Sequence, residues 1–180
     1  MLKTGCVNGG IFAPHESKAL PEDIEPPLES EVKQGDVLMS RASGSRALIG
    51  SAAMVVEQPP ARLLLSDEIY RLRLREDIIT ADFCVLTMGS TTLHHQIEGA
   101  ISGAEGLANN IAQSDIRELL IPLPPLPEQH AIVAHIAAET AKLDALREAT
   151  ERTLGLLKER RAALIAATVT GKISLEMTTA

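Results

Sequence analysis

Hydrophobic and polar positions follow one pattern in the first two thirds of the chain and another in the last third. Up to about residue 120, short apolar runs are separated by Gly, Pro, Asn and Ser, as in strands joined by turns. From residue 128 the chain is rich in Ala, Leu, Glu, Lys and Arg and contains no proline. Between them, the four prolines of Ile121–Pro127 exclude a helix interior and favour an extended connector.

This pattern predicts an α+β chain in three parts. Residues 1–120 form a small, mixed, strand-rich domain, residues 121–127 a proline-rich hinge, and residues 128–175 one long, coiled-coil-forming helical region. Within the first part, the pattern predicts two short helices between Thr80 and Ile97 that are broken at Gly89. It also predicts strands at Val37–Ser40, Ala47–Gly50, Ala53–Val56 and Leu63–Leu65.

The last third has clear helix boundaries and a long apolar seam. Pro127 and Glu128 suit a helix start, and Gly171 suits a helix end, so the helix is expected to be roughly 60 Å long. Steps of three and four residues place apolar side chains along one stripe, which a domain of this size cannot cover. A second copy or another protein is therefore expected to cover it. The predicted interface residues are Ile132, Ile136, Leu143, Leu146, Leu157 and Leu164.

Charge and cysteine usage limit the function classes. The net charge of −7 argues against an extended basic surface, so any contact with nucleic acid has to be local. No apolar run is long enough to span a membrane, and the start lacks a signal-peptide core, which predicts a cytoplasmic protein without a membrane partner. Cys6 and Cys84 are isolated from each other in sequence and are expected to be reduced thiols.

The sequence offers weak support for catalysis. Cys84 with His94 and His95 lacks a third orienting group and an activating context, and a nucleophile elbow is absent. His130 and His135 do not have the i, i+4 spacing of a helical metal pair, and the chain has no Gly-rich phosphate loop. We therefore expect no catalytic residue, no metal and no cofactor in this chain.

Two groups of side chains are candidates for contact with DNA. The first is a Gly/Ser loop between two arginines, whose guanidinium, hydroxyl and open amide groups suit a phosphate or a guanine edge: Arg41, Ser43, Ser45 and Arg46. The second, weaker group lies near the start of the chain: Lys3, Thr4, Asn8 and Lys18. A solvated hairpin loop and a solvated edge are the alternatives for these two groups.

Two further polar sets are ambiguous. The alternation in Ile69–Arg75 places Arg71, Arg73 and Arg75 on one face, where surface ion pairs with neighbouring carboxylates are favoured over DNA contact. Asn109 and Asn110 suit contact with phosphate or adenine, and a turn or a helix cap explains them equally well.

Ordered motifs in both parts of the chain resemble one protein family. Ile121–Gln129, Ile132-Val133, Leu156–Ile165 and Val169–Ile173 are similar to the second long helical region of type I restriction-modification specificity subunits. The segment Gly35–Ser45, with Ile49-Gly50, resembles a Gly-Asp-Val/Ile-Leu-x-Ser-Arg motif in their target recognition domains, and Asn110–Ile116 resembles the lead-in to the helix. The resemblance identifies the chain as the C-terminal half of such a subunit, with one recognition domain and one long helix.

The resemblance implies a function and a set of partners. It implies a non-catalytic subunit that reads one half of a bipartite double-stranded DNA target, while methyl transfer, ATP hydrolysis and cleavage belong to other subunits. The implied protein partners are the methyltransferase (M) subunit, the restriction (R) subunit and a second copy of this chain. Two copies paired through antiparallel helices predict an inverted-repeat target with a fixed spacer.

An alternative from another class stays open. The first thirty or so residues match the family pattern poorly, which is also expected of a recognition domain truncated at its N-terminus. The alternative is a remnant that acts only as a coiled-coil interaction protein and does not bind DNA. The acidic net charge favours this alternative, and the loop between Arg41 and Arg46 favours DNA recognition.

Overall fold

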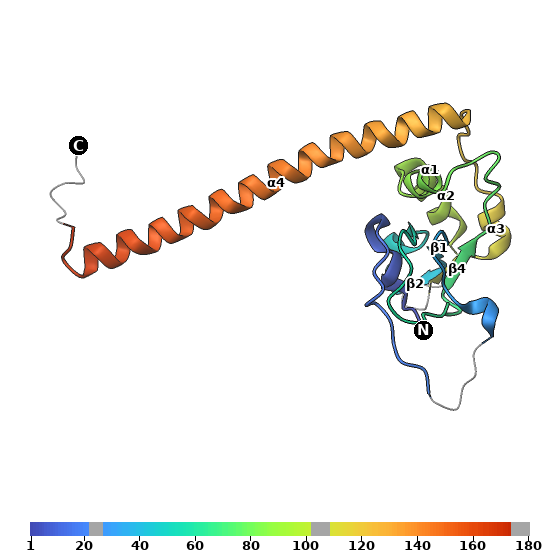
Figure 1. Ribbon diagram of the computed structural model, residues 1–180, viewed down its shortest axis with the longest axis horizontal. Helices are drawn as coiled ribbons and strands as arrows, with labels where there is room; N and C mark the ends of the chain where they lie inside the picture. The colour runs from blue at the N-terminus through green and yellow to red at the C-terminus, as the bar shows by residue number, and fades with distance from the viewer. Residues whose placement is uncertain (22–26, 102–108, 174–180) are drawn as a thin grey trace. The chain divides into compact units, whose positions relative to one another are not determined.

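The computed structural model describes residues 1–21, 27–101 and 109–173. Two compact units are present, Met1–Val133 and Ala134–Ala180. The first, which we call the recognition unit, contains a small sheet and three short α-helices, and the second contains most of one long helix (Figure 1). The α+β fold class predicted from the sequence is confirmed.

A three-stranded antiparallel sheet forms the centre of the recognition unit. Its strand order is β3-β1-β4, with Met39 of the central strand opposite Ala52 on one side and Tyr70 on the other. A separate pair of short strands, β2 and β5, joins Ser43 to Asn109. The strands are β1 (Val37–Ser40), β2 (Ala42–Ser43), β3 (Ala52–Met54), β4 (Ile69–Leu72) and β5 (Asn109–Asn110).

The central strand is buried on both faces because each face has its own apolar cluster. Successive side chains of a strand point to opposite faces, so Leu38 joins one cluster and Met39 the other. The first cluster includes Cys6 and Val7 of η1 (Thr4–Gly10), a 3-10 segment at the chain start. The second includes residues of α1 (Ala81–Met88) and α2 (Thr91–Ala100).

The predicted helix pair is confirmed, and its boundaries have identifiable caps. The Thr80 hydroxyl accepts a hydrogen bond from the Phe83 amide at the start of α1, and the Ser90 hydroxyl accepts one from the Leu93 amide at the start of α2. Gly89 separates the two helices as expected. A third helix, α3 (Gln113–Arg117), precedes the proline-rich segment.

Three strand predictions were wrong or incomplete. The segment predicted as a strand at 47–50 forms the 3-10 turn η3 (Arg46–Leu48), followed by Gly50 with φ +85°. That positive φ, which glycine adopts readily, turns the chain toward β3 and prevents an extended run. Leu63–Leu65 forms one isolated bridge, Leu64 to Glu31, and β3 is shorter than predicted.

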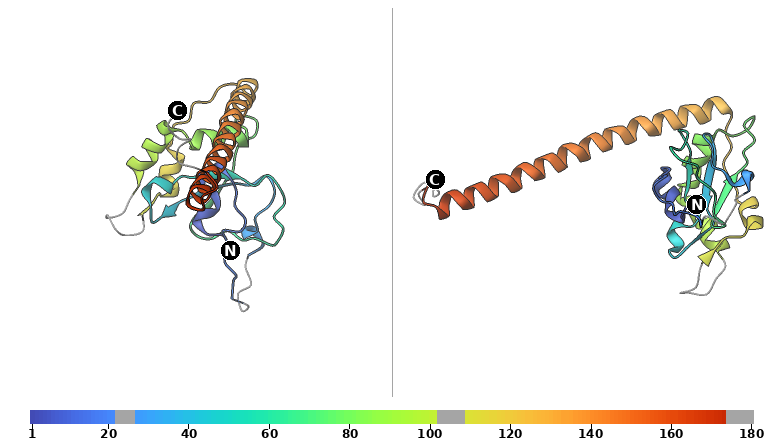
Figure 2. Two further views of the ribbon diagram at one scale, coloured as in Figure 1. Left: turned by 90° about the vertical axis from the view of Figure 1, so that its left-hand side faces the viewer. Right: turned by 60° about the horizontal axis from the view of Figure 1, so that its bottom comes forward.

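The long helix α4 spans Leu126–Val169 as one unbroken element (Figures 1 and 2). At 44 residues it is about 66 Å long at about 1.5 Å per residue. Its end is the one expected at Gly171, which has φ +70°, while the Lys172 amide donates to the Ala167 carbonyl at 2.8 Å. These are the features of a Schellman cap. Residues 174 and 175 of the predicted helical region lie outside the described residues.

No helix within the described ranges is long and apolar enough to cross a membrane.

Candidate nucleic-acid interface

The Arg41–Arg46 loop connects β1 to β3 and is shaped by local hydrogen bonds. Ser43 lies in β2, and its hydroxyl accepts a hydrogen bond from the Ser45 amide at 3.2 Å, which tightens the turn around Gly44. Gly44, Ser45 and Arg46 are exposed. The loop therefore presents a serine hydroxyl and one guanidinium to solvent between strand β2 and the 3-10 turn η3.

Arg41 is half-buried against β4. Its guanidinium lies over the Tyr70 ring, 5.5 Å from the centroid, and its Nη1 donates to the Tyr70 hydroxyl at 3.4 Å. Its Nε donates to the Asp67 carbonyl. Arg41 therefore helps to hold the loop on the sheet, and contact with DNA stays a prediction for this residue.

Arg46 is exposed and bound to a different element. Its Nη2 donates to the Glu98 carbonyl in α2 at 3.3 Å. The two arginines of the loop are thus held by β4 and by α2, respectively, and the structure does not show them meeting on one anion. Four of the five guanidinium N–H groups of Arg46 remain for a ligand after this bond.

The second predicted group is partly gathered at the chain start. Leu2 and Ser17 form an antiparallel bridge, so Lys3 and Lys18 lie at the two sides of the same short ladder. The N-terminal ammonium donates to the Lys18 carbonyl at 2.7 Å, and burial, followed by the charge of Lys18, lowers the pKa of this ammonium. Lys3 and Lys18 are exposed. Thr4 begins η1, and Asn8 is exposed within it.

The alternating arginines differ in burial and in ion pairing. The side chain of Arg71 is 12% exposed and forms an ion pair with Asp36 at 3.0 Å, while also donating to the Glu29 and Glu31 carbonyls. The expectation of a surface ion pair is wrong for Arg71 because β1 brings Asp36 beside it. The expectation is confirmed for Arg75, whose partner Asp77 lies at 3.2 Å.

The structure contains an arginine-lined groove that the sequence did not predict. It has a volume of about 710 Å3 and a largely apolar floor that includes Leu72, Ile116 and Ile121. Its lining includes four arginines and no carboxylate, which is notable in an acidic chain. The signal for it is weak because Arg117 is distant in sequence from the other three, Arg71, Arg73 and Arg75.

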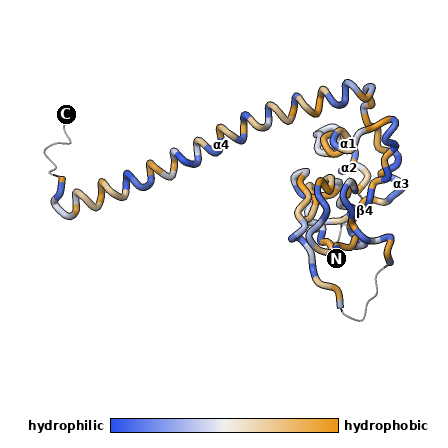
Figure 3. The backbone as a smooth tube through the Cα atoms, viewed as in Figure 1, coloured by the Kyte–Doolittle hydropathy of each residue, from blue (hydrophilic) through white to orange (hydrophobic). Residues whose placement is uncertain are grey.

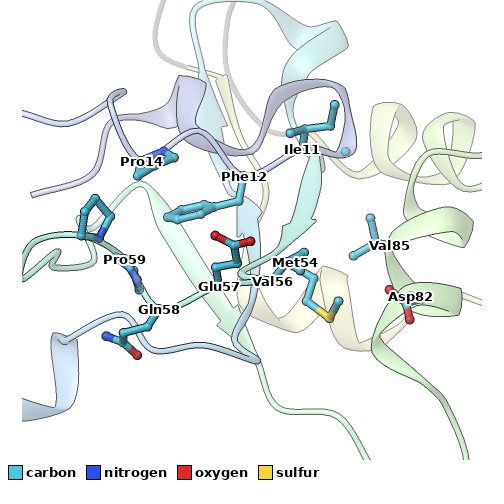
Figure 4. Close-up of a pocket in the computed structure, with 12 residues that line it drawn as sticks. Ile11, Phe12, Pro14, Met54, Val56, Glu57, Gln58, Pro59, Asp82 and Val85 are labelled. Carbon is cyan, nitrogen blue, oxygen red and sulfur yellow. The ribbon is translucent and has the colours of Figure 1, made fainter. Parts of the chain in front are cut away.

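A second pocket has the opposite character (Figure 4). It encloses about 410 Å3 between η1, the segment after β3 and α1, and is lined by Phe12, Met54 and Val85 among other apolar groups. The carboxylates of Glu57 and Asp82 are its charged lining groups, and no Lys or Arg lines it. Phosphate is therefore disfavoured here.

Asn109 and Asn110 form β5, so the alternatives of a turn and a helix cap are both wrong for them. Asn109 is 5% exposed and lies opposite Ser43 in the loop. This pairing is the long-range contact that converts Ala42–Ser43 into a strand, where the sequence predicts a flexible loop.

The thiols and imidazoles are not arranged for catalysis. Burial raises the pKa of the Cys84 thiol to about 11, so it is protonated at neutral pH and is a poor nucleophile. Burial likewise raises the pKa of Cys6 to about 11. His94 pairs with Glu98 on α2 at 3.4 Å. In the part of the chain that the structure describes, no three His, Cys, Asp or Glu side chains are placed to hold a metal ion.

The α4 seam is exposed in the single chain. Hydrophobic and hydrophilic residues alternate along the whole helix (Figure 3). Leu143 is 66% exposed and Leu146 is 64% exposed, and Leu157 and Leu164 each expose half or more of their surface. Ile136 is exposed and Ile132 is half-buried. All six predicted interface positions thus keep apolar surface accessible to a partner.

Two glutamines have a structural role that their sequence context does not reveal. Gln129 is fully buried and Gln96 is half-buried, and both bind backbone groups at or near the proline-rich segment. Single glutamines in helical sequences are normally solvated, so only a three-dimensional structure reveals them.

Comparisons with known proteins return specificity subunits of restriction enzymes. The chain is 32% identical over 136 residues to the type I restriction enzyme EcoEI specificity subunit of Escherichia coli, which covers 76% of this chain and 23% of that protein. It is 22% identical over 174 residues to the StySPI specificity subunit of Salmonella potsdam, with 97% and 36% covered. For the EcoKI specificity subunit of Escherichia coli strain K12, identity is 21% over 146 residues, with 81% and 31% covered.

The chain therefore spans between 23% and 36% of the length of these curated relatives. No protein-family model matches it. Among solved structures, the S subunit of a type I restriction-modification system from M. genitalium aligns with 64% of this chain and 28% of that one, with a TM-score of 0.48 and 18% identity. The resemblance noted in the sequence is confirmed by the curated relatives: the chain is similar to type I restriction enzyme specificity subunits, and each alignment covers part of such a subunit.

Proposed function

We propose that this chain is a non-catalytic DNA-recognition component of a type I restriction-modification system. The recognition unit reads one half of a bipartite double-stranded target, and α4 sets the distance to the other half and docks the methyltransferase subunit. The observation that carries the proposal is a similarity to a specificity subunit over 97% of this chain, which includes residues of both compact units.

The DNA-contacting residues are assigned to the two basic groups of the recognition unit. Arg46 and Ser45 are exposed on a loop between β2 and η3, and Arg41 and Ser43 support that loop. Such an arrangement suits base-edge or phosphate contact because the presenting backbone is already ordered. The second group consists of Lys3, Thr4, Asn8 and Lys18, and it contributes phosphate contacts. We also propose three functional parts: residues 1–120 recognise DNA, residues 121–127 connect, and residues 128–175 form the helical spacer.

The partners follow from the exposed seam of α4. An apolar stripe of this length requires another helix, supplied by the M subunit or by a second copy of the chain. An antiparallel pair of copies would present two recognition units related by a two-fold axis and would read an inverted repeat. Methyl transfer and cleavage are assigned to the M and R subunits, and the chain itself is expected to need no cofactor.

The decisive experiment reconstitutes the complex. The chain is co-purified with a type I M subunit, its mass is measured by light scattering, and DNA binding is measured at several salt concentrations. The proposal expects a stable complex with a preferred sequence and a steep salt dependence, with a slope of about −0.9 per neutralised phosphate. A complex that binds every duplex equally, or no duplex, contradicts it.

Two variants test whether the loop contacts DNA. Arg46→Ala combined with Ser45→Ala is expected to weaken DNA binding at least about tenfold without dissolving the complex. Arg62→Ala, which removes an exposed arginine paired with Glu31 at 3.6 Å, is the matched control for lost charge. Equal losses in the two variants would remove the loop from the interface.

A second candidate function is a helical interaction protein that does not bind DNA. Two observations favour it: the net charge of −7, and the engagement of both loop arginines by groups within the chain. The same reconstitution distinguishes the two functions, because this candidate forms the complex and leaves DNA affinity and sequence preference unchanged from those of the M subunit alone.

A further inference from the structure

The segment between α3 and α4 has little capacity to hold itself in place. Three of its residues, Pro122, Pro124 and Pro125, are prolines, which have no N–H to donate, and a chain of this kind forms no internal backbone ladder. Leu120 and Leu123 leave 78% and 49% of their surface exposed, so their side chains bury little apolar surface. A fixed conformation of this segment therefore requires contacts with other parts of the chain.

Gln96 of α2 binds the start of the segment. Its Nε2 donates to the Leu120 carbonyl at 3.0 Å, and its Oε1 accepts a hydrogen bond from the Leu120 amide at 2.9 Å. The two bonds pair a side-chain amide with one backbone residue in the same way that two strand residues pair across a ladder. Rotation of the backbone at Leu120 would break both bonds at once.

Gln129, in the first turn of α4, binds the other end. Its Nε2 donates to the Pro124 carbonyl at 2.8 Å and to the Ile78 carbonyl at 2.7 Å, and its Oε1 accepts from the Thr80 amide at 3.0 Å. The side chain is 0% exposed, and both of its N–H groups are used. Ile78 and Thr80 lie in the chain leading into α1, so the bonds join the start of α4 to the start of α1.

Apolar contacts support the segment between the two glutamines. Ile116, Leu119 and Ile121 pack against the second apolar cluster of the recognition unit. All of these groups, including the first turns of α4, belong to the compact unit Met1–Val133.

We propose that Gln96 and Gln129 are positioning residues that convert the proline-rich segment from a hinge into a fixed joint. The first turn of α4 is then part of the recognition unit and is not tethered to it by a flexible linker. The consequence for DNA rests on the proposed function: a helix measures the distance between half-sites only if its start is fixed to the domain that reads them.

The test compares two variants with two matched controls. Gln96→Ala and Gln129→Ala remove the clamps, while His95→Ala and His130→Ala change exposed neighbours on the same helices. Nitroxide labels on cysteines introduced at Gln58 and Ala131, both exposed, report the distance between the body of the recognition unit and the first turns of α4, which belong to the same compact unit. Cys6 and Cys84 are buried, so the introduced thiols are labelled selectively. Excess unlabelled chain removes distances between copies.

The proposal expects a narrow distance distribution in the unsubstituted chain and in both controls. Gln129→Ala is expected to widen it at least about twofold, and Gln96→Ala is expected to widen it less, because one buried clamp remains. Amide exchange identifies the broken clamp, since Gln96→Ala should accelerate exchange at Leu120 and Gln129→Ala at Thr80, each about tenfold. A broad distribution in the unsubstituted chain, or an unchanged one in both variants, overturns the proposal.

Selectivity for the length of the DNA spacer distinguishes a positioning role of the two glutamines from a purely stabilising one. The reconstituted complex is tested on targets whose spacers are one base pair shorter or longer than the preferred one. With the joint intact, both changes weaken binding strongly, whereas Gln129→Ala lowers this selectivity while keeping affinity for the preferred spacer within about threefold. An unchanged selectivity in Gln129→Ala overturns the proposal. If the unsubstituted complex has no DNA preference, the proposed function fails while the label distances still decide the joint.

Discussion

The recognition unit and the long helix bury the same residue type to opposite extents. Leu38 and Leu93 in the recognition unit are 0% and 1% exposed, whereas Leu143 and Leu146 in α4 are 66% and 64% exposed. The recognition unit has a sheet whose two faces are each covered by an apolar cluster, whereas almost every residue of α4 beyond Val133 is exposed. The comparison teaches that one region covers its own apolar surface, whereas the other exposes an apolar stripe that only the proposed partner helix would cover.

The largest expected effect comes from substitutions in the exposed seam of α4. Leu143→Asp combined with Leu146→Asp places two charges in the seam, where the assembled state would bury them without partners. We expect the affinity of the assembly to fall by more than about a hundredfold, which corresponds to about 3 kcal/mol. Light scattering should show the mass of the dispersed chain, and the recognition unit should stay folded.

The matched control for this pair introduces the same two charges at positions outside the seam. Ala141→Asp with Ala145→Asp adds two carboxylates on the opposite side of the same helical turns, outside the seam. This variant should retain the assembled mass. Dispersal by both pairs would show that charge, and not the seam, controls assembly.

The second effect lowers the stability of the recognition unit and leaves the α4 seam unchanged. Gly50 has φ +85°, and a Cβ there would lie 2.4 Å from Cδ1 of Ile97, which is fully buried. Gly50→Ala is expected to lower the free energy of unfolding by about 2–4 kcal/mol, from left-handed strain together with overpacking. Urea unfolding measures it.

Gly35 separates these two causes. Its φ is +87°, but a Cβ there would meet nothing within 4 Å. Gly35→Ala should therefore show the strain alone, about 1–2 kcal/mol. A loss at Gly50 no larger than the loss at Gly35 would mean that Ile97 moves aside without cost.

The third effect tests how burial changes an ion pair inside the recognition unit. Arg71→Met leaves the Asp36 carboxylate with only the Lys33 amide as donor and removes the Arg71 donor from two backbone carbonyls, where the paired side chains are 12% and 16% exposed. We expect a loss of about 2 kcal/mol in the free energy of unfolding. Arg75→Met breaks an ion pair whose side chains are 75% and 68% exposed, and should cost at most about 0.5 kcal/mol. Similar losses would contradict the burial argument.

Local sequence signals predicted the helices better than the strands. Thr80, Gly89 and Gly171 fix helix ends through short-range capping, and these ends lie where the sequence places them. The strand expected at 47–50 failed because Gly50 adopts a positive φ. Strand pairs depend on contacts between distant segments, so neither the β2–β5 pair nor the isolated bridge at Leu64 could be read from local alternation.

The candidate site was predictable in composition and less so in geometry. The loop with Arg46 and Ser45 is exposed as a polar, Gly-containing segment should be. The sequence could not show that Arg41 stacks on Tyr70, because this contact depends on the pairing of β1 with β4. It also could not show that Gln129 is buried, because a helix start reveals its burial only through the groups packed against it.

The smallest expected effect uses the two buried thiols to report folding of the recognition unit alone. Burial raises the pKa of Cys6 and Cys84 from 9.0 to about 11, so the folded state keeps the neutral thiol while the unfolded chain ionises first. Stability from these groups is therefore fully present below pH 9 and is lost as the pH rises toward 11, by at most about 1 kcal/mol per thiol at pH 10. Urea unfolding at pH 8 and pH 10 should show a smaller decrease for Cys6→Ala with Cys84→Ala than for the unsubstituted chain. The α4 seam contains no thiol, so Leu143→Asp with Leu146→Asp should leave this pH dependence unchanged. If the seam variant removed it, the recognition unit would depend on assembly for its core, and the two regions would not be independent.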